Sequence, residues 1–403
     1  MNIARKAYQR VFNGVMRAMI PLFPYREPKL VEDIPALVAT LKEHSLDNVM
    51  IITGPRVRGL GLTAPLEKLL GESGISYVVY DGTLPNPTSD NVEEAREMYL
   101  ANGCRALIAF GGGSVMDCAK AVGARIVRPK KPLYKMAGLI KVCRRLPLLI
   151  AVPITAGTGS ETTVASVIVD AKTHHKYVIN DFCLIPHYVL LDPAVTACMP
   201  KGITSTTGMD ALTHAVEAYI GKARTRATKR AAEESVRLIF ENLERAYSQA
   251  DDMEARQNML HASYLAGTAF TKSYVGYVHA VAHTLGGRYG VAHGYANAIL
   301  LPKVLRAYGK GAEKPLAELA RKVGLADAEL PSCVAAELII SHIEGMNARM
   351  EIPEKFDCIK AADIPEMAKT VAKEANPLYP VPVLWDAKEL EKLYHLVYDE
   401  SCE

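Results

Sequence analysis

The sequence predicts an α/β half followed by an all-helical half. Through about residue 195, short apolar runs rich in valine, isoleucine and leucine alternate with helical patterns, which is typical of βαβ units. After Asp192-Pro193 and Met199-Pro200 the pattern changes to long helical stretches with few strand candidates. A chain of 403 residues also exceeds a comfortable single core. We therefore expect an amphipathic helical extension at 1–30, an α/β domain at 31–200 and an all-helical domain at 201–403.

The N-terminal extension has one apolar helical stripe, made of Ile3, Ala7, Val11, Val15 and Met19. Its basic residues lie mostly off this stripe, and two prolines, at positions 21 and 24, end the helix. Two interpretations stay open. The helix packs on its own domain or on a partner subunit, or it docks as a basic amphipathic helix on a membrane surface or a protein shell.

Five continuous apolar runs are the strand candidates of the first half. They span residues 48–53, 76–80, 105–110, 148–152 and 188–191. Continuous apolar character, in contrast to strict alternation, indicates a parallel sheet that is covered on both faces. Residues 164–170 and 177–180 add a predicted hairpin.

Composition excludes several classes of function. A formal net charge of +3 with dispersed basic residues gives no electrostatic case for binding nucleic acid. No run approaches the roughly 18 apolar residues that a transmembrane helix needs. The eight cysteines show no C-x-x-C spacing, and several lie in apolar stretches, which favours a reducing, cytoplasmic location.

A glycine-rich turn follows the third strand candidate. Residues 106–110 lead directly into Gly111, Gly112, Gly113 and Ser114, and a helical stretch comes next. Glycines let the backbone approach a ligand closely, and the N–H groups at a helix start favour an anion. Ser114 and Asp117 form a capping-box-like pair. We predict a pyrophosphate cradle, with a well-capped tight turn as the alternative.

A second glycine-rich bend follows the strand candidate at 148–152. It offers the hydroxyls of Thr155 and Thr158 to a phosphate or a ribose. The G-x-G-x-x-A stretch that begins at Gly59 is interpreted as a chance match, because it starts six residues beyond its strand.

Histidines and one aspartate form a metal-ligating pattern in the helical half. Asp210 and His214 stand at positions i and i+4 of a predicted helix, so both side chains can reach one point. A carboxylate with neutral imidazoles suits a borderline cation such as Fe(II) or Zn(II). A set without cysteine indicates a catalytic site. Spacing alone pairs His279 with His283 as the remaining ligands, although His293 lies fourteen residues after His279.

Four stretches together resemble the iron-containing (group III) alcohol dehydrogenase family, which is related in fold to glycerol dehydrogenase and dehydroquinate synthase. They are "FGGGSVMDCAK", "PITAGTGSE", "GMDALTHAVEAY" and "GYVHAVAHTLGGRYGVAHGYANAILLP". The resemblance runs from about residue 30 to about residue 395. It implies a dinucleotide-binding first domain, a metal-binding catalytic second domain and a homodimer.

The resemblance also implies roles for individual residues. It makes Asp210, His214, His279 and His293 the four metal ligands, and His283 a non-ligand histidine close to nicotinamide and substrate. Phe270 matches an aromatic residue beside the reacting centre. The positions that match cofactor contacts are Asn86, Gly113, Ser114, Thr155, Thr163 and Lys176. The implied activity is hydride transfer between NAD(P)(H) and a small alcohol or aldehyde.

One departure from the family bears on the choice of nucleotide. Family members that favour NAD carry an aspartate where Gly54 stands here, and such a carboxylate would repel a 2′-phosphate. The chain instead offers Arg56 and Arg58 nearby, whose guanidinium groups suit a phosphate. We therefore expect NADP(H) to be favoured over NAD(H). The alternative activity, a lyase of the dehydroquinate synthase type, fits less well because it uses a Glu/His/His ligand set.

Overall fold

The computed structural model describes residues 3–399, with the exception of the side chains of Ile3, Arg5 and Pro21. The chain forms two compact units. One is the α/β unit, Pro24–Cys198, and the other, the helical unit, joins the residues up to Phe23 to those from Met199 onward. The N-terminal helix thus belongs to the same unit as the C-terminal half.

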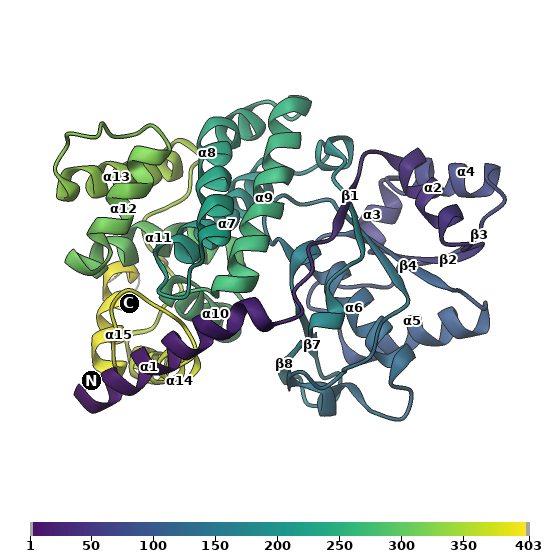
Figure 1. The fold of residues 1–403 in the computed structure, drawn as a ribbon, viewed down its shortest axis with the longest axis horizontal. Coiled ribbons are helices and arrows are strands. Elements are labelled where there is room, and N and C mark those ends of the chain that lie inside the picture. The colour runs from purple at the N-terminus through teal and green to yellow at the C-terminus, as the bar shows by residue number, and fades with distance from the viewer. Residues whose placement is uncertain (1–2, 400–403) are drawn as a thin grey trace. The chain divides into compact units, whose positions relative to one another are not determined.

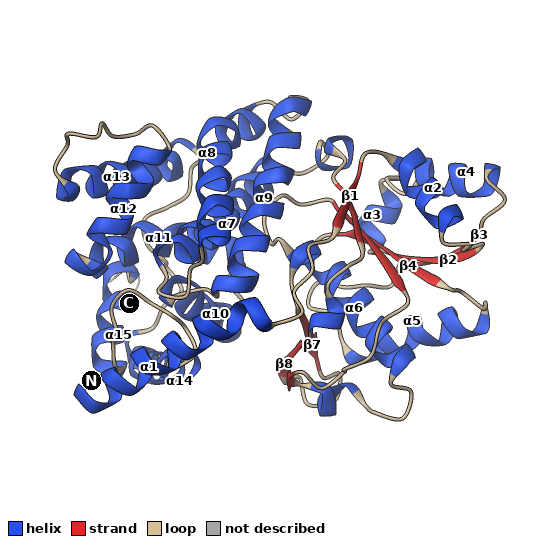
Figure 2. Cartoon of the chain, viewed as in Figure 1, coloured by secondary structure: helices blue, strands red, loops and turns tan. Residues whose placement is uncertain are grey.

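The α/β unit is built on a six-stranded parallel sheet, drawn in red in Figure 2, with the strand order β1-β9-β6-β4-β2-β3. Its strands are β1 Lys29–Val31, β2 Asn48–Ile52, β3 Ser76–Tyr80, β4 Ala106–Gly111, β6 Leu148–Pro153 and β9 Tyr188–Leu190. All five predicted strands are present to within a residue or two. The three-residue edge strand β1 was not predicted, because it is too short and too exposed to leave an apolar run.

Helices cover both faces of this sheet, as the continuous apolar strands predicted. Leu37 and Leu66, from the helices α2 and α4, join the core on one face, where they pack with Val49 and Ile108. On the other face α6 packs against β4 and β6 (Figure 1). The helices of the unit are α2 Ile34–Glu43, α3 Pro55–Gly59, α4 Ala64–Glu72, α5 Ser89–Ala101 and α6 Gly113–Val127, with short 3-10 turns at 133–136, 160–162, 182–184 and 193–196.

The strand order reverses between β2 and β4. From β2 the chain moves first to β3 on one side and then returns to β4 on the other. Such a reversal leaves a crevice at the carboxyl ends of the two strands, which is where open α/β sheets bind ligands. Gly54 follows β2 and Gly112 follows β4, so both predicted nucleotide contacts lie at this end of the sheet.

The predicted hairpin is also present, in a second, smaller sheet. β7, Ala165–Val169, pairs in antiparallel register with β8, Lys176–Asn180, and the two-residue strand β5, Gly138–Leu139, adds to β8.

The helical unit confirms the all-helical prediction. Among its described residues only the isolated bridge between Phe356 and Tyr398 has strand character. Its helices are α1 Ile3–Met19, α7 Lys201–Ile220, α8 Arg226–Ser248, α9 Met253–Ser273, α10 Tyr277–Tyr289, α11 His293–Tyr308, α12 Lys310–Lys322, α13 Ser332–Arg349, α14 Ile364–Ala375 and α15 Ala387–Val397, with 3-10 turns at 20–22 and 361–363.

Helix α1 packs on its own unit through its polar face. Gln9 and Asn13 are almost fully buried, at 1% and 4% exposure. Gln9 donates to Asn376 Oδ1 at 2.6 Å, and Asn13 donates to the carbonyl of Pro377 at 2.9 Å. Arg10 donates to the carbonyls of residues 381 and 382. The first of the two interpretations of the extension, packing on its own domain, therefore describes the contacts of α1.

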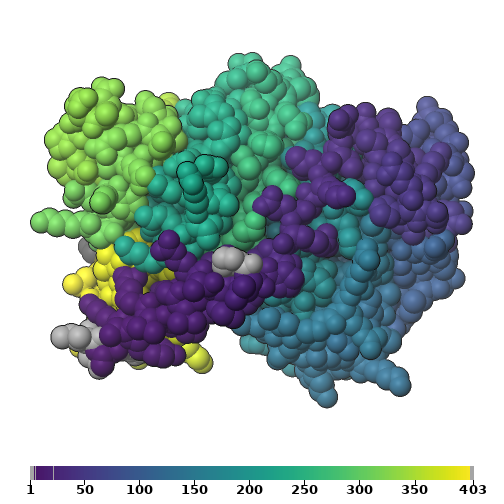
Figure 3. Space-filling model, viewed as in Figure 1, coloured from purple at the N-terminus to yellow at the C-terminus, as the bar shows by residue number. Residues whose placement is uncertain are grey.

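The apolar face of α1 is exposed. Figure 3 shows the helix, in purple, at the surface of the protein. We call five large exposed side chains of α1 and of the 3-10 turn that follows it the α1 stripe: Tyr8, Val11, Val15, Met19 and Leu22, which are 62%, 66%, 56%, 40% and 74% exposed. Val11, Val15 and Met19 belong to the predicted apolar face, whereas the side chain of Ile3 lies outside the described residues. The amphipathic pattern is therefore real, but the face that packs is the polar one.

Two further expectations can be compared with the described residues. None of their helices is long and apolar enough to cross a membrane. Their seven cysteines are all free thiols, whereas Cys402 lies outside the described part of the chain.

Candidate metal centre and nucleotide loops

Helix α7 presents two of the predicted ligands on one face. Asp210 and His214 are four residues apart and are 2% and 5% exposed. The helix lies close to α8 and α11 because a glycine stands at each of the two contacts. A Cβ atom on Gly208 would lie 2.2 Å from Leu243 in α8, and one on Gly294 in α11 would lie 2.4 Å from the carbonyl of Thr206. The first contact sets the distance between α7 and α8, and the second sets the distance between α7 and α11, which carries the fourth predicted ligand.

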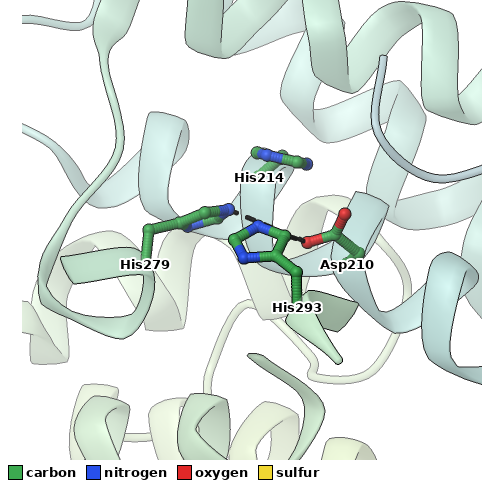
Figure 4. A group of neighbouring side chains, drawn as sticks. All are labelled: Asp210, His214, His279 and His293. Carbon is green, nitrogen blue, oxygen red and sulfur yellow. Dashed lines mark ion pairs between the residues drawn. The ribbon is translucent and has the colours of Figure 1, made fainter. Parts of the chain in front are cut away.

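The four predicted ligands come together in the helical unit. One potential ligand atom each of Asp210, His214, His279 and His293 lies within 4.8 Å of the other three. Figure 4 shows the four side chains converging on a common point. Asp210 Oδ1 is 3.4 Å from His293 Nε2 and 3.8 Å from His279 Nε2. Three of the residues are buried and His293 is exposed, so the cluster is closed on most sides.

The electrostatics of the cluster favour a bound cation. Burial lowers the pKa of His279 well below its usual value, and the neighbouring His293 and His283 add to this effect. Its imidazole is therefore neutral, as a metal ligand must be. Burial raises the pKa of Asp210, against the opposing effects of His214 and Asn297. His279 Nε2 is buried and accepts no hydrogen bond from the described residues, so its lone pair suits a metal ion.

His283 and Phe270 flank the cluster without joining it. The ring of His283 stacks on His293 with centroids 5.4 Å apart, and its Nδ1 bonds to Glu374 Oε1 at 2.7 Å. Spacing alone predicted His283 as a ligand, but its Nδ1 is hydrogen-bonded to Glu374 and the residue is not part of the cluster. Phe270, near the end of α9, stacks on His214 with centroids 4.1 Å apart and an interplanar angle of 13°.

Three polar residues around the cluster were missed in the sequence. Glu217 bonds to His279 Nδ1 at 2.6 Å, and Asn297 donates to Asp210 Oδ1 at 2.6 Å. Both were visible in the spacing, since Glu217 follows His214 by three residues and Asn297 follows His293 by four. Glu374 carried no such signal, because it reaches His283 from a helix 91 residues further along the chain.

In the α/β unit the two glycine-rich bends approach each other. A Cβ atom on Gly112 would lie 3.4 Å from Thr155 Oγ1, and one on Gly113 would lie 3.2 Å from the side chain of Thr158. The glycines therefore allow the start of α6 to pack close to the second bend. This leaves the first N–H groups of a fifteen-residue helix at the carboxyl end of β4.

The predicted capping pair of Ser114 and Asp117 is wrong. The N-cap of α6 is Gly112, which has no side chain, and Ser114 lies inside the first turn. Ser114 Oγ instead accepts a hydrogen bond from the backbone N–H of Asn86 at 3.3 Å. Asp117 is half-buried, and burial raises its pKa to about 7 while the positive charge of Lys120 opposes this effect. The carboxyl therefore belongs to the charged cluster around the buried Lys120.

That cluster connects α6 to the loop after the second bend. The Lys120 side chain is fully buried and donates to the carbonyls of Ser160, Thr163 and Ala165 at 2.6, 3.0 and 2.9 Å. It also bonds to Thr163 Oγ1 at 2.9 Å. The predicted cofactor residue Thr163 is thus held by a lysine that the sequence analysis did not single out.

Two other predicted cofactor residues meet at the edge of the small sheet. Lys176 Nζ donates to Asn86 Oδ1 at 3.0 Å, and both residues are exposed. Asn86 has a φ of 55°, an unusual conformation that asparagine tolerates better than most residues. The pair therefore brings an amide and an ammonium group within reach of a ligand.

Gly54 and the two arginines that follow it differ in their exposure and in their contacts. Gly54 is buried at the N-cap of α3, where a Cβ atom would lie 3.0 Å from the carbonyl oxygen of Thr83. Arg56 is exposed, and Arg58 pairs with Glu67. Arg56 is therefore the better placed of the two guanidinium groups for a ligand phosphate.

Comparisons with known proteins agree with this arrangement. Residues 26–193 match the iron-containing alcohol dehydrogenase family, and residues 204–398 match the C-terminal region of the Fe-containing alcohol dehydrogenase family. The 1,3-propanediol dehydrogenase of Citrobacter freundii is 39% identical over 82% of this chain and 85% of its own length. The NAD-dependent methanol dehydrogenase of Bacillus methanolicus is 32% identical over 84% of this chain and 90% of its own length.

A solved structure extends the likeness to the whole fold. The alcohol dehydrogenase from Oenococcus oeni superposes with a TM-score of 0.88 and 32% identity, covering 93% of this chain and 100% of that one. The dehydroquinate synthase alternative is not favoured by any of these matches. The chain belongs to the iron-containing alcohol dehydrogenase family.

Proposed function

We propose that the protein transfers a hydride between a nicotinamide nucleotide and a small alcohol or aldehyde, with Asp210, His214, His279 and His293 holding one Fe(II) ion, or Zn(II) in its place. The observation that carries the proposal is the convergence of these four ligand atoms within 4.8 Å of one another. Residues 201–403 would be the catalytic domain and residues 31–200 the nucleotide-binding domain, with residues 1–30 as an extension.

The donor set fits a borderline divalent cation. One carboxylate and three imidazoles are the ligands that Fe(II) and Zn(II) accept, and a set without thiolates is typical of catalytic centres. When bound, such an ion supplies Lewis acidity toward the oxygen of the alcohol or aldehyde. Phe270 stacks on His214 and would hold that imidazole in its plane.

His283 would carry the proton. Glu374 accepts its Nδ1–H, which leaves Nε2 free to take the hydroxyl proton of an alcohol or to return it to an aldehyde. Burial favours the neutral form of Glu374, but hydrogen bonds from His283 and Tyr379 outweigh this effect and lower its pKa. Both His283 and Glu374 line a cavity of about 680 Å³, which gives the proton a way to solvent.

The cofactor would be held by the loops of the α/β unit. The pyrophosphate would lie at the start of α6, against Gly112, Gly113 and Ser114, and the hydroxyls of Thr155 and Thr158 would face it from the second bend. Thr163, Asn86 and Lys176 would complete the contacts, as implied by the family resemblance. Asp117 would act indirectly, through the buried cluster around Lys120.

The activity is tested on protein purified without oxygen and loaded with Fe(II). Incubation with NADPH and butanal should consume the cofactor, as followed by absorbance. Asp210→Ala and His279→Ala should abolish turnover and sharply lower the metal content. Near-normal activity with one metal ion per chain in either variant would contradict the proposed centre. A panel of alcohols, diols and aldehydes then ranks the substrates.

The preferred nucleotide is proposed to be NADP(H). No carboxylate stands at Gly54 to repel a 2′-phosphate, and the exposed Arg56 offers a positive charge two residues later. The relative from Bacillus methanolicus is described as NAD-dependent, so the two reduced nucleotides have to be compared directly. A larger kcat/KM with NADPH than with NADH is expected.

We also propose that the protein is a homodimer in the cytoplasm and that the α1 stripe packs against a second copy. Tyr8, Val11, Val15 and Leu22, together with Ala4 and Ala18, recur with the alternating spacing of a coiled-coil seam. In an antiparallel pair, Tyr8 would face Ala18 of the other copy, and Val11 would face Val15. The large Tyr8 would then meet the small Ala18, and two valines of equal size would meet at the centre of the seam.

Size and charge favour a second copy over a membrane. The exposed fractions of the α1 stripe correspond to roughly 600 Å² of accessible surface per copy. If two copies covered each other's stripe, they would bury about 1,200 Å² in total, which is the lower end of the range for specific protein–protein interfaces. Among the described basic side chains of α1, Arg17 is exposed, Lys6 is partly exposed, and Arg10 is bonded to two carbonyls. Two such charges attract an anionic bilayer only weakly.

The proposed pairing is tested by photocrosslinking from a benzophenone amino acid at position 8. Crosslinks should reach the segment around Ala18 of the other copy, and Val11→Asp should abolish them and weaken association in sedimentation velocity. Leu60→Asp, at a similarly exposed apolar position, is the control. Crosslinks elsewhere, or flotation of the wild-type protein with anionic vesicles in place of self-association, would contradict the pairing.

A further inference from the structure

Glu217 makes three hydrogen bonds to the start of α10. It is 3% exposed and lies on α7, on the same side as Asp210 and His214. Its Oε1 accepts from the backbone N–H of Val278 at 2.8 Å. Its Oε2 accepts from the backbone N–H of Gly276 at 2.7 Å and from His279 Nδ1 at 2.6 Å.

These bonds give α10 an N-terminal cap from another helix. The N-cap residue of α10 is Gly276, which has no side chain, so the first N–H groups need acceptors from elsewhere. A carboxylate is the group that this end of a helix favours, because the helix dipole is positive there. Glu217 therefore determines where α10 begins, and His279 lies in the first turn of that helix.

The same carboxylate selects the tautomer of His279. Both oxygens of Glu217 accept backbone N–H groups, which is the arrangement of an ionised carboxylate, and we therefore assign the 2.6 Å contact as a donation from His279 Nδ1–H. The lone pair of the neutral ring is then on Nε2. This is the buried atom without a hydrogen bond that faces Asp210 Oδ1 at 3.8 Å.

Gly276 makes the close approach possible. A Cβ atom at this position would lie 2.5 Å from Glu217 Oε1, a distance at which the carboxylate would have to move. A side chain at position 276 would therefore push the carboxylate away from both α10 and His279. The contact between Glu217 and His279 therefore depends both on the carboxylate from α7 and on the absence of a side chain at Gly276, at the start of α10.

We propose that Glu217 is the positioning residue of the metal centre. It fixes the tautomer and the direction of His279, so the affinity of the protein for its metal depends on a carboxylate that is not a ligand. Hydrogen-bonded partners of metal-bound histidines generally act in this way. The inference rests on the metal centre assigned under the proposed function.

The test is Zn(II) affinity of the full-length, metal-free protein, measured by competition with a chromogenic chelator. Glu217→Gln keeps the shape of the side chain but puts an NH₂ group against one of its three donors. Its affinity should fall roughly 10-fold to 100-fold. Gly276→Ala reaches the same contact from the other side and should also weaken binding. Ser235→Ala removes a buried hydrogen bond to Ala262 between α8 and α9, and it is the control for a purely structural loss.

The outcomes separate the inference from the proposed function. If the wild-type protein binds no stoichiometric Zn(II), the metal centre itself is wrong. The inference is overturned if the wild-type protein binds Zn(II) and the Zn(II) affinity of Glu217→Gln is within threefold of it, while the melting temperature of the metal-free variant falls as it does for Ser235→Ala. In that case Glu217 only caps α10. Absorption spectra of the Co(II)-loaded variants add a second measurement, because a displaced His279 should change the ligand-field bands.

Discussion

Replacing Lys120 with methionine should destabilise the α/β unit. Methionine has a similar length but leaves the carbonyls of Ser160, Thr163 and Ala165 without this donor. It also removes a positive charge that acts on two carboxyls, since burial raises the pKa of both Asp117 and Glu161 to about 7 against the opposing effect of Lys120. A hydrogen bond that involves a charged group is typically worth about 1.5–3 kcal/mol, so the loss of several of them should cost about 3–5 kcal/mol. For a unit of this size, that corresponds to a melting temperature lower by roughly 10 °C.

Differential scanning calorimetry measures the effect, and Lys130→Met provides the matched control. Lys130 is exposed, so the same change of charge there should alter stability by less than about 0.5 kcal/mol. The single tryptophan, Trp385, lies in the helical unit, so its fluorescence reports whether that unit is also affected. Lys120→Met should bind NADPH more weakly at a temperature where it is folded, because the loop that carries Thr163 is no longer held. A loss below about 1 kcal/mol with unchanged NADPH binding would refute the reasoning.

Three further predictions concern separate parts of the protein. His283→Ala should keep its metal and lose much of its rate, as measured by metal analysis and kcat; if it loses metal as completely as His293→Ala, the two roles have been exchanged. Gly54→Asp should shift the ratio of kcat/KM values toward NADH, and Gly54→Ala should be measured beside it, because a Cβ atom alone meets the carbonyl of Thr83 at 3.0 Å. An aspartate variant that prefers NADPH as strongly as the alanine variant would show that Gly54 is not near the 2′-position. Burial, with Arg26 and Arg145 nearby, lowers the pKa of His187 from 6.5 to about 4, so the folded state binds fewer protons and should lose stability as pH falls from about 6.5 to 4. His187→Gln should flatten this part of the stability profile in urea unfolding, and an unchanged slope would contradict the assignment.

The strands of the α/β unit could be predicted because their signal is local. A strand buried on both faces needs apolar residues at every position, and residues 48–52 or 106–110 satisfy this without reference to the rest of the chain. β1 is only three residues long and mostly exposed, so its place in the sheet depends on pairing with β9, about 160 residues later. Such a strand has no signature of its own. The Lys120 cluster is hidden for the same reason, since it joins a helix to a loop some 40 residues away.

The candidate metal centre shows where spacing stops being informative. Helical periodicity placed Asp210 beside His214, but it favoured His283 over His293 as the partner of His279. The chain turns at Gly290, in the left-handed conformation that ends α10, and His293 then opens α11. That turn brings His293 Nε2 within 3.4 Å of Asp210, while His283 stays on α10 and bonds to Glu374. The choice between the two histidines is therefore made by a loop conformation, which only the family resemblance anticipated.

Helix α1 shows a related ambiguity. An amphipathic pattern defines two faces, but it does not say which of them is buried. Hydrophobic transfer favours burying Val11 and Val15, whereas Gln9 and Asn13 are buried instead, each with a hydrogen bond to residues 376–377. Burying amides is tolerable only because these bonds are made, and the apolar face is left available. Because the polar face of α1 is bonded to its own unit, the apolar face is left to be buried by another surface, and we expect a second copy to cover it.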